Sequence, residues 1–288
     1  MLSKLGRVAG RERVFMGDYT KGLTERRNHT EITKGFCLIC GEHGPLSIDH
    51  VPPKGSITIT RVEQVHLTEL LGAKLPSVKG VKSPNGSKFK TICLACNTKH
   101  LGANDQEVAC VFKELTARIK HHFKYANSPV NHVSVKFDAV KFCRAMIGHI
   151  LSATSVKECH VDSRGAPYFD PLRAFVMGND SAIDDTHDIY CWFYPHRRHI
   201  SAKLFAFRNQ GNLCCISLLS FFPLAFSITE KGKGIYPAGA TKVLLTDQIL
   251  HVDLSSGYIQ YSSFPLTGLE GDQMLLLTDH MAIVSYPI

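Results

Sequence analysis

Apolar residues recur at helical spacing through the middle of the chain. Over residues 105–125 they recur every three or four positions, as Val108, Val111, Phe112, Leu115, Ile119 and Phe123. This period places them on one side of an α-helix. A similar run predicts a helix over residues 138–154, with Val140, Phe142, Cys143, Met146, Ile147, Ile150 and Leu151 on its buried side. Residues 171–177 predict a short third helix.

The C-terminal part of the chain has the pattern of a β-sheet. Runs rich in Phe, Ile, Val, Leu and Tyr are separated by Gly, Pro and Asn. They predict a brief strand over 133–137 and longer strands over 189–194, 200–208, 212–228, 242–253, 258–263 and 274–286. We therefore expect an α+β fold with a largely antiparallel sheet. At 288 residues, two domains are the natural count, and we place the second, an α+β domain, at residues 131–288.

One segment of this sheet is long and uncharged enough to be tested as a membrane span. Residues 209–229 carry no charge. Polar residues crowd one end of the segment, however, and Pro223 interrupts it, so a buried central strand is the better interpretation. No secretory signal follows the first charged residues. We expect a protein without membrane insertion.

The cysteines fall into two groups. Two pairs, Cys37-Leu-Ile-Cys40 and Cys93-Leu-Ala-Cys96, have the spacing of zinc knuckles and supply four thiolates, enough for one tetrahedral structural zinc. Six others lie mostly in apolar runs and read as core residues: Cys110, Cys143, Cys159, Cys191, Cys214 and Cys215. This use of cysteine indicates a reducing compartment, and we expect a cytoplasmic protein.

Polar residues beside the cysteine pairs suggest a second metal centre. Asp49-His50 lies between the two pairs, and Asn97 follows the last cysteine directly. A structural zinc site needs none of these three side chains. A histidine beside a carboxylate, next to a zinc clamp, indicates hydrolytic chemistry.

These residues carry a family resemblance. The run from Cys37-x-x-Cys40 through Ile48-Asp49-His50-Val51-Pro52 to Cys93-x-x-Cys96-Asn97 and Leu101-Gly102 resembles the HNH endonucleases, in the subtype whose ββα-metal core has a four-cysteine zinc clamp. The resemblance covers roughly residues 35–125. It implies an N-terminal ββα-metal HNH domain, which we place with its helical extension at residues 35–130. A central Asn of the family pattern is missing, because that stretch reads Ser87-Lys88-Phe89.

The resemblance also implies roles for single residues. His50 is the expected general base, since neutral imidazole accepts a proton near pH 7. Asp49 and Asn97 are the expected ligands of one catalytic divalent ion, with Mg²⁺ or Mn²⁺ suiting their oxygen atoms. His100 is a further candidate ligand, because residues three apart share a face if Asn97 begins an α-helix.

The distribution of charge favours a nucleic-acid substrate. Residues 1–130 contain 20 Lys and Arg against 11 Asp and Glu, whereas the rest contains 13 against 14. Residues 1–34 read as a basic N-terminal arm. The long insertion at residues 55–88 leads into a lysine-rich loop with Lys74, Lys79, Lys82, Lys88 and Lys90. Such a field attracts a polyanion, and lysines favour phosphate contact over base readout.

Together these features predict a metal-dependent HNH endonuclease that hydrolyses DNA, with RNA as an open alternative. The domain layout resembles nuclease effectors of bacterial restriction or anti-phage systems, an analogy only. The near-neutral residues 131–288 are expected to dock a protein partner or a second copy of the chain. Two alternatives stay open: a non-catalytic zinc protein that binds nucleic acid, and an interaction subunit that docks a larger partner such as an ATPase.

Overall fold

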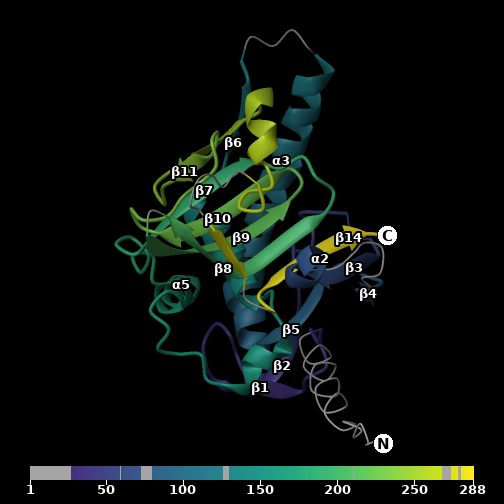
Figure 1. Cartoon of the computed structure of the whole chain (residues 1–288), viewed down its shortest axis with the longest axis vertical. Coiled ribbons are helices and arrows are strands. Elements are labelled where there is room, and N and C mark those ends of the chain that lie inside the picture. Colours follow the sequence, from purple (N-terminus) through teal and green to yellow (C-terminus); the bar gives the residue numbers. More distant parts are fainter. Residues whose placement is uncertain are drawn as a thin grey trace, which may run out of the picture.

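The cysteine motif folds as a pair of antiparallel strands that leads into a long helix. We call this pair the motif hairpin, although a long insertion connects its two strands. The computed structural model (Figure 1) describes residues 27–58, 60–72, 80–125, 130–209, 211–267, 274–277 and 280–288. Strand β2 (His43–His50) pairs antiparallel with β5 (Lys88–Cys93), and β1 (Lys34–Phe36) pairs with the other edge of β2. Most of the expected basic arm, residues 1–26, lies outside the described residues, as do Lys74 and Lys79.

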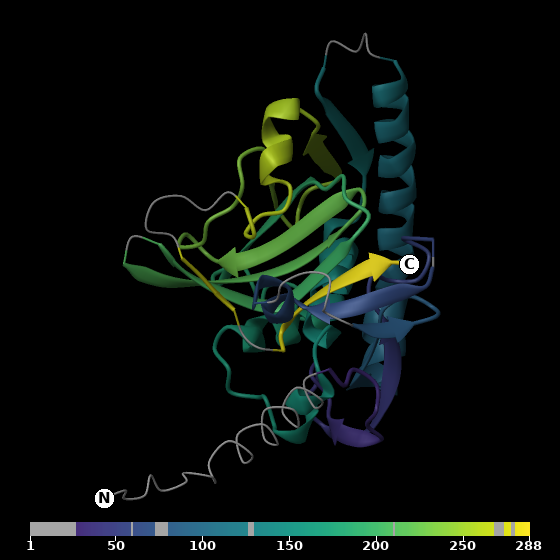
Figure 2. The same ribbon diagram turned by 45° about the vertical axis from the view of Figure 1, so that its right-hand side comes forward.

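The hairpin continues into two consecutive helical segments. A π-helix, η1 (Cys96–Gly102), follows β5 and runs directly into α3 (Ala103–Lys124). The helix predicted from the apolar spacing is confirmed. Five of the six residues named for its buried face are buried, and Phe123, near its end, is exposed. Figures 1 and 2 show α3 extending past the large sheet, with β6 (His132–Lys136) beside its far end.

A nine-stranded sheet forms the larger part of the molecule. Its strand order is β11-β7-β10-β9-β8-β14-β3-β4, with β13 paired to β8, and every pairing is antiparallel. The strands are β3 (Val62–His66), β4 (Val81–Ser83), β7 (His187–Phe193), β8 (His199–Asn209), β9 (Asn212–Phe221), β10 (Leu224–Glu230), β11 (Thr241–Val243), β13 (Met274–Leu277) and β14 (Ala282–Pro287). The largely antiparallel sheet expected from the sequence is confirmed.

Several predicted strands have different limits in the structure. The run 212–228 is a hairpin of β9 and β10, because the chain turns at Pro223. Residues 242–253 divide between β11 and β12 (Ile249–Asp253), which pairs with β6. The strand predicted at 258–263 is wrong, since residues 256–261 form a 3-10 helix, η3. Tyr258 and Ile259 are exposed there, and so short an apolar run does not distinguish a strand from a helix.

The insertion inside the cysteine motif belongs to the large sheet. After β3 and the short helix α2 (Leu67–Gly72), the chain forms β4 and then returns to the motif hairpin through β5. Strand β3 pairs with β14 at the end of the chain, with His66 opposite Ile283 and Val62 opposite Pro287. Figures 1 and 2 show these two strands side by side. Strand pairing therefore crosses the boundary expected near residue 130, and independent folding of the two regions stays a prediction.

Helix α4 (Ala139–Ser152) lies at the centre of the main core. It confirms the helix predicted at 138–154, and its apolar residues are buried between α3, the motif hairpin and the sheet. Helix α5 (Phe169–Val176) and the 3-10 helix η2 (Val156–His160) follow it. One hydrophobic cluster joins residues of the motif, such as Phe89 and Leu101, to sheet residues such as Phe221. A second cluster, around Phe205 and Phe207, also includes Leu67 of α2.

The uncharged segment contributes to these cores. Within its described residues Leu213 is the one large apolar side chain that is exposed, whereas Leu218, Leu219 and Phe226 are buried. The prediction of a buried central strand is confirmed, with β9 and β10 both inside the sheet. None of the helices in the described ranges combines the length and the apolar character needed to span a membrane.

Helix α4 approaches η1 closely where Gly148 meets Leu101. A Cβ atom added at Gly148 would lie 2.7 Å from Cδ1 and 2.9 Å from Cγ of Leu101, whose side chain is fully buried. Since the core leaves little room for Leu101 to move, we expect Gly148→Ala to destabilise the protein by about 1–3 kcal/mol. Urea unfolding monitored by fluorescence measures this. Gly257→Ala is the control, because its Cβ would meet no atom within 4 Å. Equal stability of the two variants would contradict the packing.

Candidate functional site

The four motif cysteines converge at one end of the hairpin. Their Sγ atoms all lie within 4.8 Å of one another, and Cys40 Sγ is 3.9 Å from Cys93 Sγ. A tetrahedral zinc with Zn–S distances of about 2.3 Å requires S···S separations of about 3.8 Å. Cys37 and Cys96 are buried, and Cys40 and Cys93 are partly exposed. The cluster is thus compatible with one structural zinc, as the spacing predicted.

Three of the thiols, those of Cys37, Cys40 and Cys96, affect one another's pKa. A hydrogen bond from Cys96 is the main cause that lowers the pKa of Cys37 to about 5. Burial raises the pKa of Cys40 to about 11, and the interaction with Cys37 raises the pKa of Cys96 strongly. One thiolate therefore hinders ionisation of its neighbours. A divalent cation removes this conflict, because it stabilises all the thiolates together.

The C-terminal part of the chain holds the first cysteine knuckle in place. Arg173 of α5 is buried, and its Nε donates a hydrogen bond to the Leu38 carbonyl over 3.1 Å. Its Nη1 donates to the Ser163 carbonyl over 2.8 Å. Met177 Sδ lies 4.0 Å from Cys96 Sγ. The cysteine cluster is consequently packed against α5 and is not held by the hairpin alone.

His50 ends strand β2 beside two lysines. It lies opposite Lys88 in the register of β2 and β5, so the two side chains share one face of the hairpin. Partial burial lowers the pKa of His50, and the positive charges of Lys54 and Lys88 act in the same direction. The neutral imidazole is favoured as a result, and this is the form that accepts a proton.

Asn97 is fixed to the same strand from the other side of the motif. Its Nδ2 donates hydrogen bonds to the Ile48 carbonyl over 2.9 Å and to Ser47 Oγ over 3.1 Å. These contacts hold the beginning of η1 against β2, one residue before Asp49. Both use the amide nitrogen, so the amide oxygen is available as a ligand.

The side chain of Asp49 is buried, whereas a ligand for an ion bound from solvent is usually exposed. The Asp49 side chain is 4% exposed and contacts α4, where Oδ2 accepts a 2.6 Å hydrogen bond from Ser152 Oγ and lies 3.0 Å from His149 Nδ1. The Nε2 of His149 lies 2.9 Å from Asp105 Oδ1. His149 therefore links two carboxylates, one from β2 and one from α3.

His149 and Ser152 are the members of this buried network that the sequence did not indicate as site residues. Burial alone would lower the pKa of His149, but the charges and hydrogen bonds of Asp49 and Asp105 outweigh it and raise the pKa to about 10. In the sequence, His149 sits within the apolar pattern of residues 138–154, where it has no motif around it. A histidine on the buried side of a predicted helix was the one available signal.

His100 was predicted to share a face with Asn97 on the expectation of an α-helix, but the structure has a different helix there. Residues 96–102 form a π-helix, with i to i+5 hydrogen bonds, so a spacing of three no longer places Asn97 and His100 on one face. The partly exposed His100 stays a prediction without that support. Among the described residues, the four cysteines are the one group of three or more His, Cys, Asp or Glu side chains close enough to hold a metal ion.

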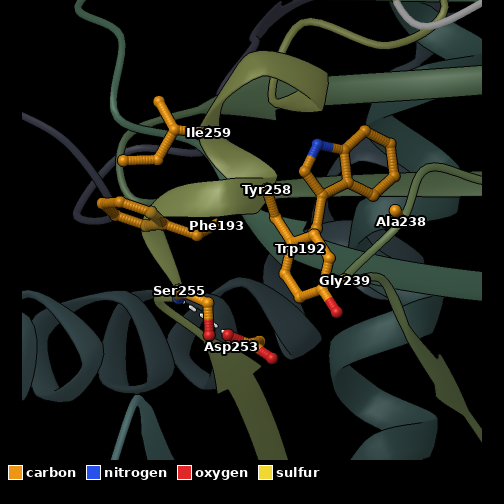
Figure 3. A pocket seen from close by; sticks show the side chains of 8 residues that line it. All are labelled: Trp192, Phe193, Ala238, Gly239, Asp253, Ser255, Tyr258 and Ile259. Carbon is orange, nitrogen blue, oxygen red and sulfur yellow. Dashed lines mark hydrogen bonds between the residues drawn. The ribbon is translucent and has the colours of Figure 1, made fainter.

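A small aromatic pocket lies elsewhere, between the large sheet and η3. Figure 3 shows Trp192, Phe193 and Tyr258 around it, together with Asp253 and Ser255. Its volume is about 10 Å³, room for at most a single water molecule. It is too small to bind a substrate.

The cysteine cluster predicts a coupling between zinc and folding. We expect Cys93→Ser to lower both zinc content and melting temperature, because it removes one of four ligands and zinc binding contributes to folding. Since Arg173 ties α5 to the knuckle, chelation should destabilise the full chain in a single thermal transition. Metal analysis and calorimetry measure both effects, with Cys110→Ser on the exposed face of α3 as the control. A wild-type protein that is stable without zinc would contradict this prediction.

The network around His149 predicts a pH-dependent stability. The folded-state pKa of about 10 lies above the ordinary value of 6.5, so the stabilisation is complete below about pH 6.5 and is lost as the pH rises towards 10. The difference in unfolding free energy between wild type and His149→Gln should therefore be larger at pH 6 than at pH 9.5. Urea titrations at the two pH values test this. A difference that is the same at both pH values would show that folding does not raise the pKa of His149.

Comparison with known proteins found no match: no family model fits the chain, and no curated protein and no solved structure is significantly similar to it.

Proposed function

We propose that this protein is a metal-dependent nuclease that hydrolyses phosphodiester bonds at the end of β2. The observation that carries the proposal is the attachment of Asn97 to Ile48, which brings the two separated parts of the motif together beside Asp49 and His50. The antiparallel pairing of β2 with β5, followed by the helical segments η1 and α3, supports the HNH resemblance, although the insertion with β3, α2 and β4 separates the two strands in sequence. The family assignment itself is part of the proposal.

His50 is the proposed general base. Hydrolysis needs a water molecule to lose a proton as it attacks phosphorus. The lowered pKa of His50 keeps its imidazole neutral at pH 7, ready to take that proton. Its position at the end of a strand, partly exposed, allows a substrate to approach.

Asp49 and Asn97 are the proposed ligands of the catalytic divalent ion. Both hydrogen bonds described for the Asp49 carboxylate end on Oδ2, which leaves Oδ1 for an ion. Asn97 likewise keeps its amide oxygen. Two such oxygen donors suit Mg²⁺ or Mn²⁺. When bound, the ion would supply positive charge for the phosphate and its leaving oxygen.

Lysines beside His50 fit a phosphodiester substrate. Lys54 and Lys88 are both close enough to affect the pKa of His50, and Lys88 lies opposite it on the hairpin. A substrate phosphate placed near the imidazole would thus meet two cations. This agrees with the excess of basic residues in the first 130 positions.

A second candidate function is a zinc protein that binds nucleic acid without cutting it. The burial of Asp49 and its contacts with His149 and Ser152 favour this alternative, because they give the carboxylate a structural use. In such a protein the cysteine cluster and the lysines would keep their roles. His50 and Asn97 would then be dispensable.

Nicking of supercoiled plasmid DNA distinguishes the two candidates. We expect wild-type protein to nick with Mg²⁺ or Mn²⁺ and not with EDTA, and His50→Ala to be slower by roughly 10²–10⁴. Because the pKa of His50 is lowered, the wild-type rate should fall only below the usual imidazole value of about 6.5. His160→Ala, an exposed histidine on η2, is the matched control and should cut normally. Equal rates for His50→Ala and wild type would reject the assignment of the base.

A further inference from the structure

A groove is formed where residues 27–31 meet β3 and β4, the two strands of the insertion. Its volume is about 490 Å³. Residues 27–31 line it together with Gln64 of β3 and Lys88 of β5. The remaining lining residues come from the β4 region: Val81, Lys82, Ser83 and Pro84. The groove is therefore built jointly by the cysteine motif and by its insertion.

The wall formed by residues 27–31 is firmly held. His29 is buried, stacks on His66 of β3 and packs against Phe89 of β5. Its carbonyl accepts a hydrogen bond from the Lys90 backbone N–H over 2.8 Å. The Asn28 side chain accepts hydrogen bonds from the backbone N–H groups of Thr30 and Glu31. These contacts make the groove a preformed feature of the fold.

The lining of the groove is suited to an anion. Three cations line it, Arg27, Lys82 and Lys88, against one carboxylate, Glu31. Arg27 is partly neutralised by Glu69 at 2.9 Å, whereas Lys82 is exposed.

Gln64 supplies a further polar group in the groove. Its side chain is 97% buried, and its Nε2 has no hydrogen-bond partner among the described residues. A buried donor without an acceptor is destabilising, and an oxygen of a bound ligand would supply the missing acceptor.

Lys88 connects the groove with the candidate catalytic residue. It lines the groove and lies opposite His50 in the pairing of β5 with β2. The neighbouring backbone N–H of Val51 donates a 3.1 Å hydrogen bond to the Ser87 carbonyl, which fixes this register. An extended anionic chain in the groove would thus be led towards His50.

We infer that this groove binds the sugar-phosphate backbone of a nucleic-acid strand and directs it to His50. The part that concerns His50 rests on the proposed nuclease function, whereas binding in the groove does not. The lining offers cations and an amide, and its aromatic side chain, His29, is buried and already stacked. Contacts should therefore be to phosphate rather than to bases, and independent of sequence.

Salt-titrated fluorescence anisotropy on full-length His50→Ala protein tests the inference without cleavage. The probes are a labelled single strand, the corresponding duplex and an RNA of the same sequence. Adding Lys82→Ala or Lys88→Ala should weaken binding several-fold for unrelated sequences alike. Each should also reduce the slope of log K against log salt, by about 0.7 on single strands or 0.9 on duplex. The RNA and DNA arms identify which backbone the groove prefers.

Lys233→Ala is the matched control. Lys233 is exposed and follows β10, which lies towards the opposite edge of the sheet from β4. Its affinity and salt slope should equal those of the parent, and thermal melting should show that all variants are folded. The inference is overturned if the parent binds no nucleic acid, or if Lys82→Ala and Lys88→Ala bind like the parent.

The experiments distinguish rejection of the groove inference from rejection of the nuclease proposal. If wild-type protein nicks plasmid but both lysine variants bind normally, the groove inference is wrong and the nuclease proposal stands. If binding depends on Lys82 and Lys88 but wild-type protein does not nick with any metal, the groove binds nucleic acid and the nuclease proposal is wrong. The Gln64→Leu variant gives a further check, since loss of the amide should weaken binding without changing the salt slope.

Discussion

Convergence of four thiols within 4.8 Å is the constraint on which the rest of this structure depends. Strands β2 and β5 are separated by a long insertion, and bringing the ends of such a connection together has an entropic cost. Thiolates that share a cation would hold the two strands together at their other end, where Cys40 precedes β2 and Cys93 ends β5. With β2 and β5 fixed, Asn97 can reach the carbonyl of Ile48, and Lys88 can lie opposite His50. The same closure leaves the insertion free to form β3 and β4, which complete the edge of the large sheet.

The candidate site is therefore held by both halves of the chain. Arg173 of α5 binds the carbonyl of Leu38 in the first knuckle, and His149 of α4 contacts Asp49 on β2. The final strand, β14, pairs with β3 inside the insertion. The sequence predicted that this motif belongs to an N-terminal domain, with residues 131–288 as a separate second domain. Here several of the contacts that position its residues come from beyond position 130, and one hydrophobic cluster includes residues of both parts.

Local sequence patterns predicted most helices and strands, but they did not predict contacts between residues far apart in the sequence. The amphipathic period found α3 and α4, and the cysteine spacing found the thiol cluster, because each of these signals is contained in a short stretch of sequence. The pairing of β3 with β14 joins segments more than two hundred residues apart, and no local pattern encodes it. For Asp49 the residue was identified, but its burial was not, since that depends on His149 and Ser152 of a distant helix. The π-helix at Cys96–Gly102 was missed because its residues also suit an α-helix.

Burial of the network around His149 also determines which residue can report on catalysis. Removing one partner from a buried ion pair leaves an uncompensated charge, which typically costs about 3–5 kcal/mol. Loss of activity on replacing Asp49 would follow equally from a lost metal ligand and from His149 left without its carboxylate. His50 lacks this ambiguity, because it is partly exposed and lies on the hairpin face shared with Lys88. A defect confined to His50 would be chemical, whereas a defect at Asp49 is interpretable only beside the stability of the same variant.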